Sequence, residues 1–223
     1  MKTLARDLIK FYGHLDPPKI PADIEILHPQ PNQEVMDTVK TFFLKFYPDN
    51  KPRRLMLGIN PGRFGAGITG VNFTAPRQLT QHCGIDPSWG NGSELSAEFI
   101  YEMITAYGGT TSFYSDYFIG AVCPLGFIKG GKNINYYDDK RLHQAVTPFI
   151  KATLKKQVKM GFRTDKCFCI GEEKNYKFLS ALNEQHHYFR EIVPLPHPRF
   201  IMQYRRKTKD VYINKWLQEL KTA

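Results

Sequence analysis

Residues 54–59 read RLMLGI, a largely apolar run that decides the fold. Apolar side chains that follow one another without alternation are typical of a strand buried on both faces of a parallel sheet. Similar runs recur at 117–122, 166–170 and 189–193. Helical patterns separate these four runs, and strands that alternate with helices form parallel sheets. The sequence therefore predicts an α/β fold, a three-layer α/β/α sandwich with a central, mostly parallel four-stranded sheet.

The predicted helices follow from apolar residues that recur at helical spacing. They lie at 1–13, at 33–47, at 95–107, from an N-cap at Asp138 to Val158, from 171 to about 182, and from about 208 onward. Prolines at 17, 18 and 21 end the first of them. The length of 223 residues fits one domain. We expect a single domain, 1–223, on which residues 1–50 pack as a helical extension.

Charge and cysteine usage narrow the functional class. Lys and Arg number 31 against 21 Asp and Glu, a net charge of +10 that favours polyanionic partners without identifying one. Cys83, Cys123, Cys167 and Cys169 lack the C-x-x-C spacing of a zinc or iron–sulfur site, and the last two are predicted core residues. Free thiols, with no secretory leader and no apolar span, predict an intracellular protein that avoids membranes. We expect a monomer, cytoplasmic in a bacterium or nuclear in a eukaryote.

Ligands of parallel sheets bind beyond the carboxyl ends of the strands, where three loops are predicted. The first loop, 58–73, reads GINPGRFGAGITGVNF, and its Asn-Pro-Gly also suits an ordinary turn. Its G-x-G-x-x-G at 65–70 starts too late after the strand and opens no helix, which argues against dinucleotide binding. The second loop, 121–133, reads AVCPLGFIKGGKN. Its Gly-Gly-Lys lacks the rest of a phosphate-binding loop and suits a flexible surface loop.

The third loop, 194–209, reads PLPHPRFIMQYRRKTK and places His197 between prolines at the end of a strand. A lone histidine is most often structural, but the residues that follow His197 include both large apolar side chains and cations. Large apolar side chains are interleaved with cations, as in proteins that push into a base stack while holding phosphates. The alternative is an amphipathic start to the final helix. The residues concerned are Arg199, Phe200, Ile201, Met202, Tyr204, Arg205, Arg206, Lys207 and Lys209.

Together these motifs resemble a known family. GINPGRFGAGITGVNF, then VCPLGF with GKN, then LPHPR before a terminal helix containing Trp, are similar to the single-strand-selective monofunctional uracil-DNA glycosylases. The resemblance runs from about Arg53 to Leu220, about three quarters of the chain, with the motif order and spacing kept. Phe73 falls at the base-stacking position of the family, thirteen residues after Asn60.

The resemblance implies a role for each motif residue. Asn60 would hold the attacking water, and His197 would stabilise the negative charge that builds on uracil O2. It implies neither metal nor cofactor, and no lysine nucleophile. Base-binding residues would be Gly58, Ile59, Pro61, Gly62, Phe64, Phe73, Ala121, Cys123 and Pro124. Residues that contact DNA would be Lys132, Asn133, Arg199, Phe200, Arg205, Arg206 and Lys207.

Two positions bear on which base is removed. Relatives that exclude thymine have a tyrosine where this chain has Gly62, so glycine leaves room for a substituent at uracil C5. The family asparagine that reads N3–H and O4 is replaced by Ala121. Backbone near Phe73, a water, Asn72 or Asn133 are the candidates to replace it. The segment after His197 also departs from the family, because it lacks the His-Pro-Ser-Pro run and is longer.

The function expected from the sequence is that of a monofunctional DNA glycosylase. It would remove uracil and 5-substituted uracils, such as 5-hydroxymethyluracil, from DNA and so initiate base excision repair. One alternative is a non-catalytic binder of damaged or single-stranded DNA, and another is a different nucleotide-handling α/β enzyme. The presence of both Asn60 and His197 favours the enzyme, because a binder needs neither.

Overall fold

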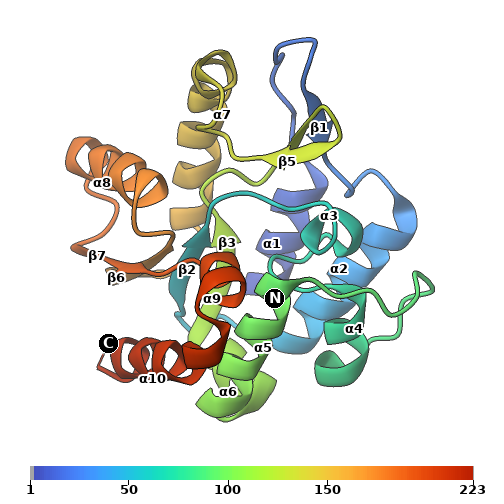
Figure 1. Ribbon diagram of the computed structural model, residues 1–223, viewed down its shortest axis with the longest axis vertical. Coiled ribbons are helices and arrows are strands. Elements are labelled where there is room, and N and C mark those ends of the chain that lie inside the picture. The colour runs from blue at the N-terminus through green and yellow to red at the C-terminus, as the bar shows by residue number, and fades with distance from the viewer. Residues whose placement is uncertain (1–2, 223) are drawn as a thin grey trace.

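The computed structural model describes residues 3–222 and is built on a four-stranded parallel sheet (Figure 1). Its strands are β2 (Arg54–Gly58), β3 (Tyr117–Ala121), β6 (Arg163–Ile170) and β7 (Glu191–Leu195), in the order β3-β2-β6-β7. Every residue of β2 and β3 is buried, because helices cover the sheet on both faces. The predicted fold class is confirmed.

Contacts of β3 show which helices cover each face. On one face, Phe118 packs on Phe43 of α2 (Gln33–Phe46), and Gly120 faces α7 (Lys140–Val158) so closely that a Cβ would lie 2.8 Å from Gln157 Oε1. On the other face, Tyr117 stacks on Phe113 of α6 (Gly109–Asp116). Its hydroxyl donates to the Leu220 carbonyl of α10 (Lys209–Lys221) at 2.6 Å. Also present are α5 (Leu95–Tyr107) and α8 (Lys174–His186), which packs on β6.

A second, antiparallel sheet lies beside the carboxyl edge of the first, and the sequence did not reveal it. It contains β1 (Glu25–Leu27), β4 (Gly126–Lys129) and β5 (Lys132–Ile134), in the order β1-β4-β5. The prediction of a flexible loop at 130–132 is wrong, because these residues belong to the hairpin of β4 and β5. Gly130 and Gly131 have φ of 55° and 70°, the left-handed conformation that a tight two-residue hairpin turn requires. Residues 1–50 are likewise not wholly helical, since β1 lies among them.

Several boundaries differ from the prediction. The N-cap of α7 is Asp139, whose carboxylate accepts from the amides of Arg141 and Leu142, whereas Asp138 accepts from the amide of Asn135. β7 lies two residues later than expected, and β6 begins at Arg163. Short elements break up the predicted loops: α3 (Ala66–Thr69), α4 (Pro76–Gln78), the π-helix η1 (Leu79–Cys83), α9 (Pro198–Tyr204) and the 3₁₀-helix η2 (Arg206–Thr208).

The N-terminal region packs on the rest through α1 (Leu4–Gly13). Thr3 caps this helix by accepting from the amide of Arg6, and Leu8 is fully buried. Tyr12 lies 5.7 Å from Phe43 of α2, measured between ring centroids. Aromatic side chains of α1 and α2 thereby pack together in the core.

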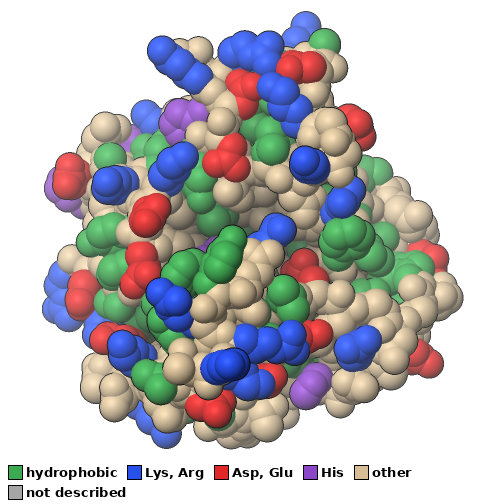
Figure 2. All heavy atoms as spheres, viewed as in Figure 1, with side chains coloured by type: hydrophobic (Ala, Val, Ile, Leu, Met, Phe, Trp, Pro, Cys, Tyr) green, Lys and Arg blue, Asp and Glu red, His purple; other side chains and the backbone are tan. Residues whose placement is uncertain are grey.

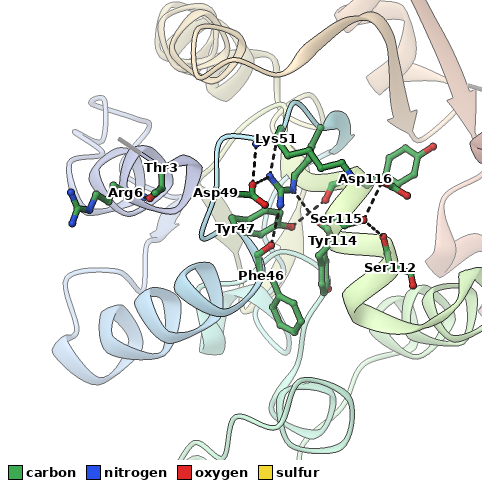
Figure 3. Close-up of polar contacts among 12 residues, drawn as sticks. Thr3, Arg6, Phe46, Tyr47, Asp49, Lys51, Ser112, Tyr114, Ser115 and Asp116 are labelled. Carbon is green, nitrogen blue, oxygen red and sulfur yellow. Dashed lines mark hydrogen bonds and ion pairs between the residues drawn. The ribbon is translucent and has the colours of Figure 1, made fainter. Parts of the chain in front are cut away.

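The buried Arg53, which precedes β2, bonds groups of several elements, and its partners Phe46, Asp49, Lys51 and Tyr114 are labelled in Figure 3. The Arg53 side chain is 2% exposed and donates to Asp49 Oδ1 at 2.7 Å and to the Tyr114 carbonyl at 2.7 Å. It also donates to the Lys51 and Phe46 carbonyls. The guanidinium group therefore satisfies three backbone carbonyls, at the end of α2, in the segment before β2 and in α6.

Arg53→Met should destabilise the protein by about 3 kcal/mol, because it leaves those buried carbonyls without donors. Urea unfolding monitored by circular dichroism measures the change. Lys40→Met is the control, because Lys40 forms only an exposed pair with Asp37 and should matter little. Equal stabilities for the two variants would contradict the role given to Arg53.

Candidate active site

A cavity of about 580 Å³ opens at the carboxyl edge of the parallel sheet. Figure 2 shows the molecular face hollowed near its centre, with Lys and Arg side chains on both sides of the hollow. All three predicted loops contribute to the lining, as does the start of α5. Lining residues that the sequence singled out are Gly58, Ile59, Asn60, Pro61, Gly62, Phe64, Phe73, Ala121, Asn133, His197, Arg199 and Phe200.

Other residues that the sequence assigned to the site lie outside the cavity lining. Cys123 and Pro124 are buried, and the Cys123 amide donates to the Ile59 carbonyl at 3.1 Å. Lys132 is exposed on the hairpin. Arg205, Arg206 and Lys207 are exposed beyond the end of α9.

Phe73 forms part of the cavity wall and is held in an uncommon backbone conformation. Its φ is 52°, in the left-handed region that non-glycine residues rarely adopt. The ring lies on Gly58, where an added Cβ would come within 2.6 Å of Phe73 Cε2. The Thr69 hydroxyl, which donates to the Thr74 carbonyl at 2.6 Å, holds the turn that carries Phe73. The Phe73 ring is thereby fixed against the end of β2, in the wall of the cavity.

His197 is fixed in one tautomer by its place at the start of α9. Its Nδ1 accepts from the amide of Arg199 at 3.1 Å, so the ring proton lies on Nε2. Burial, aided by the Arg199 charge, lowers the pKa of His197 to about 4. A neutral imidazole therefore remains at pH 7, with Nε2–H as its available donor. The ring centroid lies 5.9 Å from that of Phe73.

Asn60 is oriented by a segment that the sequence did not connect with it. Its Oδ1 accepts from the amide of Tyr136 at 3.1 Å, and its Nδ2 donates to the carbonyls of Pro61 and Ile134 at 3.3 and 3.4 Å. These partners fix which end of the amide is oxygen. The second lone pair of Oδ1 is left to accept from a ligand or a water.

Sequence reasoning missed Glu94, which precedes α5 and lines the cavity. Burial raises the pKa of its carboxyl to about 7, against the lowering effect of the Arg199 charge. No motif surrounds Glu94, and it follows no strand. Its membership of the site depends on the packing of α5 against α9.

The rim of the cavity carries exposed aromatic rings beside cations. Phe64, Phe200 and Tyr204 are 55%, 44% and 68% exposed. The Arg63 guanidinium lies 4.6 Å from the Phe64 ring centroid, and that of Arg205 lies 5.7 Å from the ring centroid of Phe200. Rings and cations in this arrangement are typical of surfaces on which nucleic-acid bases stack.

The loop expected around Phe200 is wrong, because the segment forms the amphipathic helix α9. Ile201 and Met202 are buried beneath it, whereas Phe200 and Tyr204 point outward.

Some of the basic residues that follow α9 form ion pairs within the protein. Arg206 pairs with Glu98 at 3.8 Å, and Lys209 pairs with Glu102 at 2.6 Å.

Neither a metal-binding cluster nor a membrane-spanning helix is present among residues 3–222. No group of three or more His, Cys, Asp or Glu side chains is placed to hold a metal ion. No helix in this part of the chain has the length and apolarity to cross a membrane.

Comparisons with known proteins place the chain among DNA repair enzymes. The model of the uracil DNA glycosylase superfamily matches residues 44–221. Among solved structures, the crystal structure of wild-type SMUG2 from Pedobacter heparinus is similar, with a TM-score of 0.96 and 45% sequence identity. The match covers 100% of this chain and 98% of that one. A comparison with curated proteins found no match.

The tautomer of His197 can be tested directly by imidazole ¹⁵N NMR. We expect a neutral ring with the proton on Nε2 at pH 6–9, and protonation only near pH 4, about where the lowered pKa lies. The pKa of His197 is lower in the folded protein than in the unfolded chain, so burial of the neutral ring favours folding at neutral pH. This contribution to the free energy of folding is complete above pH ~6.5 and is lost as the pH falls toward 4. Spectra of His197→Gln identify the signal. A proton on Nδ1, or titration near pH 6.5, would refute the assignment.

Proposed function

The chain belongs to the uracil DNA glycosylase superfamily, and we propose that it removes uracil and 5-substituted uracils, such as 5-hydroxymethyluracil, by a monofunctional mechanism. As a DNA glycosylase it is a hydrolase of N-glycosyl bonds that acts on DNA in base excision repair. The observation that carries the finer proposal is the meeting of neutral His197, oriented Asn60 and the Phe73 ring in one cavity. The alternative of a non-catalytic DNA binder gains no support from the comparisons.

Base binding begins with extrusion of the nucleotide from the stack, which costs a few kcal/mol. The base then lies on Phe73, and its O2 faces Nε2–H of His197. Hydrolysis leaves a uracil anion, whose charge spreads onto O2. A donor already oriented toward that oxygen stabilises the transition state more than the ground state. Because the imidazole is neutral, it stabilises the anion by donating a hydrogen bond without having to transfer its proton.

The attacking water is assigned to Asn60. Its Oδ1 already accepts from the Tyr136 amide and can accept a second hydrogen bond, from the water. An amide does not take up a proton at neutral pH, so it positions the water without acting as a general base. The site therefore depends on stabilising the leaving group. The proposed reaction forms no covalent bond to the protein, so the DNA strand stays intact.

DNA contact is assigned to the rim. Phe200 and Tyr204 project from α9 and would wedge into the stack vacated by the flipped base. Cations on both sides of the cavity would hold the phosphates. They are Arg199, Arg205, Arg206 and Lys207 on one side, and Lys132 on the hairpin beside Asn133 on the other. All these residues come from one chain, so the proposed reaction needs only a monomer.

In this proposal, the residues near Ala121 make few hydrogen bonds to N3–H and O4 of the base. Ala121 is 2% exposed and offers no polar side chain. Asn72 is already engaged, because its Nδ2 donates to Tyr12 Oη at 3.0 Å and to the Ile119 carbonyl at 3.3 Å. Asn133 Oδ1 accepts from the Arg63 amide at 3.4 Å. We therefore expect the quality of the leaving group and ease of flipping to govern base choice more than edge recognition.

Single-lesion oligonucleotides, followed by alkaline cleavage at abasic sites, test the reaction. We expect uracil and 5-hydroxymethyluracil to be removed with no strand break before alkali. His197→Ala should lower the single-turnover rate by about 10²–10³, because an oriented donor to the leaving group is lost. Asn60→Ala should cause a similar loss. Nicking without alkali, or wild-type rates in both variants, would exclude the mechanism.

Gly58→Ala tests the stacking surface. Its methyl group would force the Phe73 ring away from β2, so we expect the single-turnover rate to fall at least about tenfold. The matched control is Gly92→Ala, because nothing lies within 4 Å of a Cβ at Gly92. Unaltered excision by Gly58→Ala would show that Phe73 does not support the base.

A further inference from the structure

We infer that Glu94 reads the substituent at C5 of the flipped pyrimidine. Its carboxylate accepts a hydrogen bond from a donor such as the hydroxyl of 5-hydroxymethyluracil, and it disfavours the methyl group of thymine. The inference rests on the proposed function and adds to it the residue that distinguishes among 5-substituted uracils.

The carboxyl group lies where two glycines leave space. A Cβ at Gly62 would lie 3.6 Å from Glu94 Oε2, and a Cβ at Gly65 would lie 2.5 Å from Oε1. A side chain at Gly65 would therefore displace the carboxyl, and a larger one at Gly62 would extend into the same space. The Asn133 amide nitrogen lies 3.4 Å from the Gly62 Cβ position, which makes this corner of the cavity polar.

Among residues 3–222, the Glu94 carboxyl group has no hydrogen-bond or ion-pair partner. The acidic residues within α5, which begins just after Glu94, do have partners: Glu98 pairs with Arg77 and Arg206, and Glu102 pairs with Lys209. Arg199 is the cation whose charge acts on Glu94, and it does not outweigh the effect of burial. A partly desolvated carboxylate without a donor is costly, so a ligand that brings a donor binds favourably.

In the proposed orientation of the base, its C5 edge would face this corner. In a pyrimidine ring, C5 lies directly across from C2. With O2 on Nε2 of His197, a substituent on C5 would point away from His197, and the proposal places it in the space that Gly62 leaves open on the cavity wall. Glu94 Oε2 borders that space, within the reach of a small side chain at Gly62. A hydroxyl one carbon beyond C5 would therefore face a carboxylate oxygen.

This arrangement addresses a problem that Gly62 creates. Thymine is abundant in DNA, and glycine at this position offers no steric barrier to its methyl group. If thymine bound, its methyl group would displace water from the Glu94 carboxylate and would offer it no hydrogen-bond donor in exchange. A site built to hydrogen-bond a hydroxyl can reject an analogue that lacks it by about 10⁴–10⁵. Uracil, which has only hydrogen at C5, leaves space for a water that bridges to the carboxylate.

Single-turnover excision from one oligonucleotide sequence, carrying 5-hydroxymethyluracil, uracil or thymine at the same position, tests the inference. At a pH about two units above the Glu94 pKa of about 7, where the carboxyl group is ionised, Glu94→Ala should lower the rate ratio of 5-hydroxymethyluracil to uracil by about 10–100-fold, through loss of a charged hydrogen bond. It should also raise thymine excision relative to uracil. Glu94→Gln, which keeps an acceptor but not the charge, should give a smaller loss of the ratio. The control is Glu102→Gln on the same helix, which should keep both ratios.

The results separate this inference from the proposed function. Wild-type protein that leaves uracil in DNA would overturn both. Wild-type protein that excises uracil, with both ratios unchanged in Glu94→Ala, would overturn only the role of Glu94. If Glu94→Ala fails to fold, Glu94→Gln decides in the same way. Because each variant is judged by a ratio of substrates, a general loss of activity cannot imitate the expected result.

Discussion

The contact between the Phe73 ring and the backbone of Gly58 is the constraint on which the site depends. Gly58 ends the central strand β2, and the ring lies where any larger side chain would project. Holding Phe73 at positive φ costs of order 1–3 kcal/mol, which the surrounding structure must supply. Hydrogen bonds of Thr69 and burial of Val71 in the core stabilise the turn. A rigid stacking surface is thereby fixed to the rigid sheet.

Around that surface, backbone groups set the chemistry of the polar side chains. The Arg199 amide makes His197 Nδ1 an acceptor, and burial keeps the imidazole neutral. The Tyr136 amide similarly fixes the Asn60 carboxamide. Backbone amides do not titrate, so these orientations do not change with pH above the His197 pKa of about 4. Preorganised groups of this kind need no rearrangement when charge develops on a leaving base.

The cavity wall differs in polarity between Ala121 and Glu94. At Ala121 the wall is apolar, and the nearby Asn72 amide nitrogen is used by Tyr12 and Ile119. At Gly62 the wall is polar, with the Asn133 amide and the Glu94 carboxyl group close together. A base in this cavity would meet its stronger polar contacts at C5 and O2. In the proposed binding mode, selectivity would therefore depend on contacts at O2 and at C5, at opposite ends of the ring, more than on contacts at N3 and O4.

The sequence by itself determined the order of strands and helices, the loops at the carboxyl edge, and the motifs containing Asn60 and His197. Those features are local, because apolar periodicity and turn-forming residues act over a few positions. Only the tertiary structure decided that α9 is a helix, that residues 126–134 form a hairpin, and that Glu94 enters the cavity. It also decided the tautomer of His197 and the orientation of Asn60, whose amide partner lies 76 residues away along the chain. Contacts between such distant segments depend on how the helices pack on the sheet, and local sequence patterns do not predict that packing.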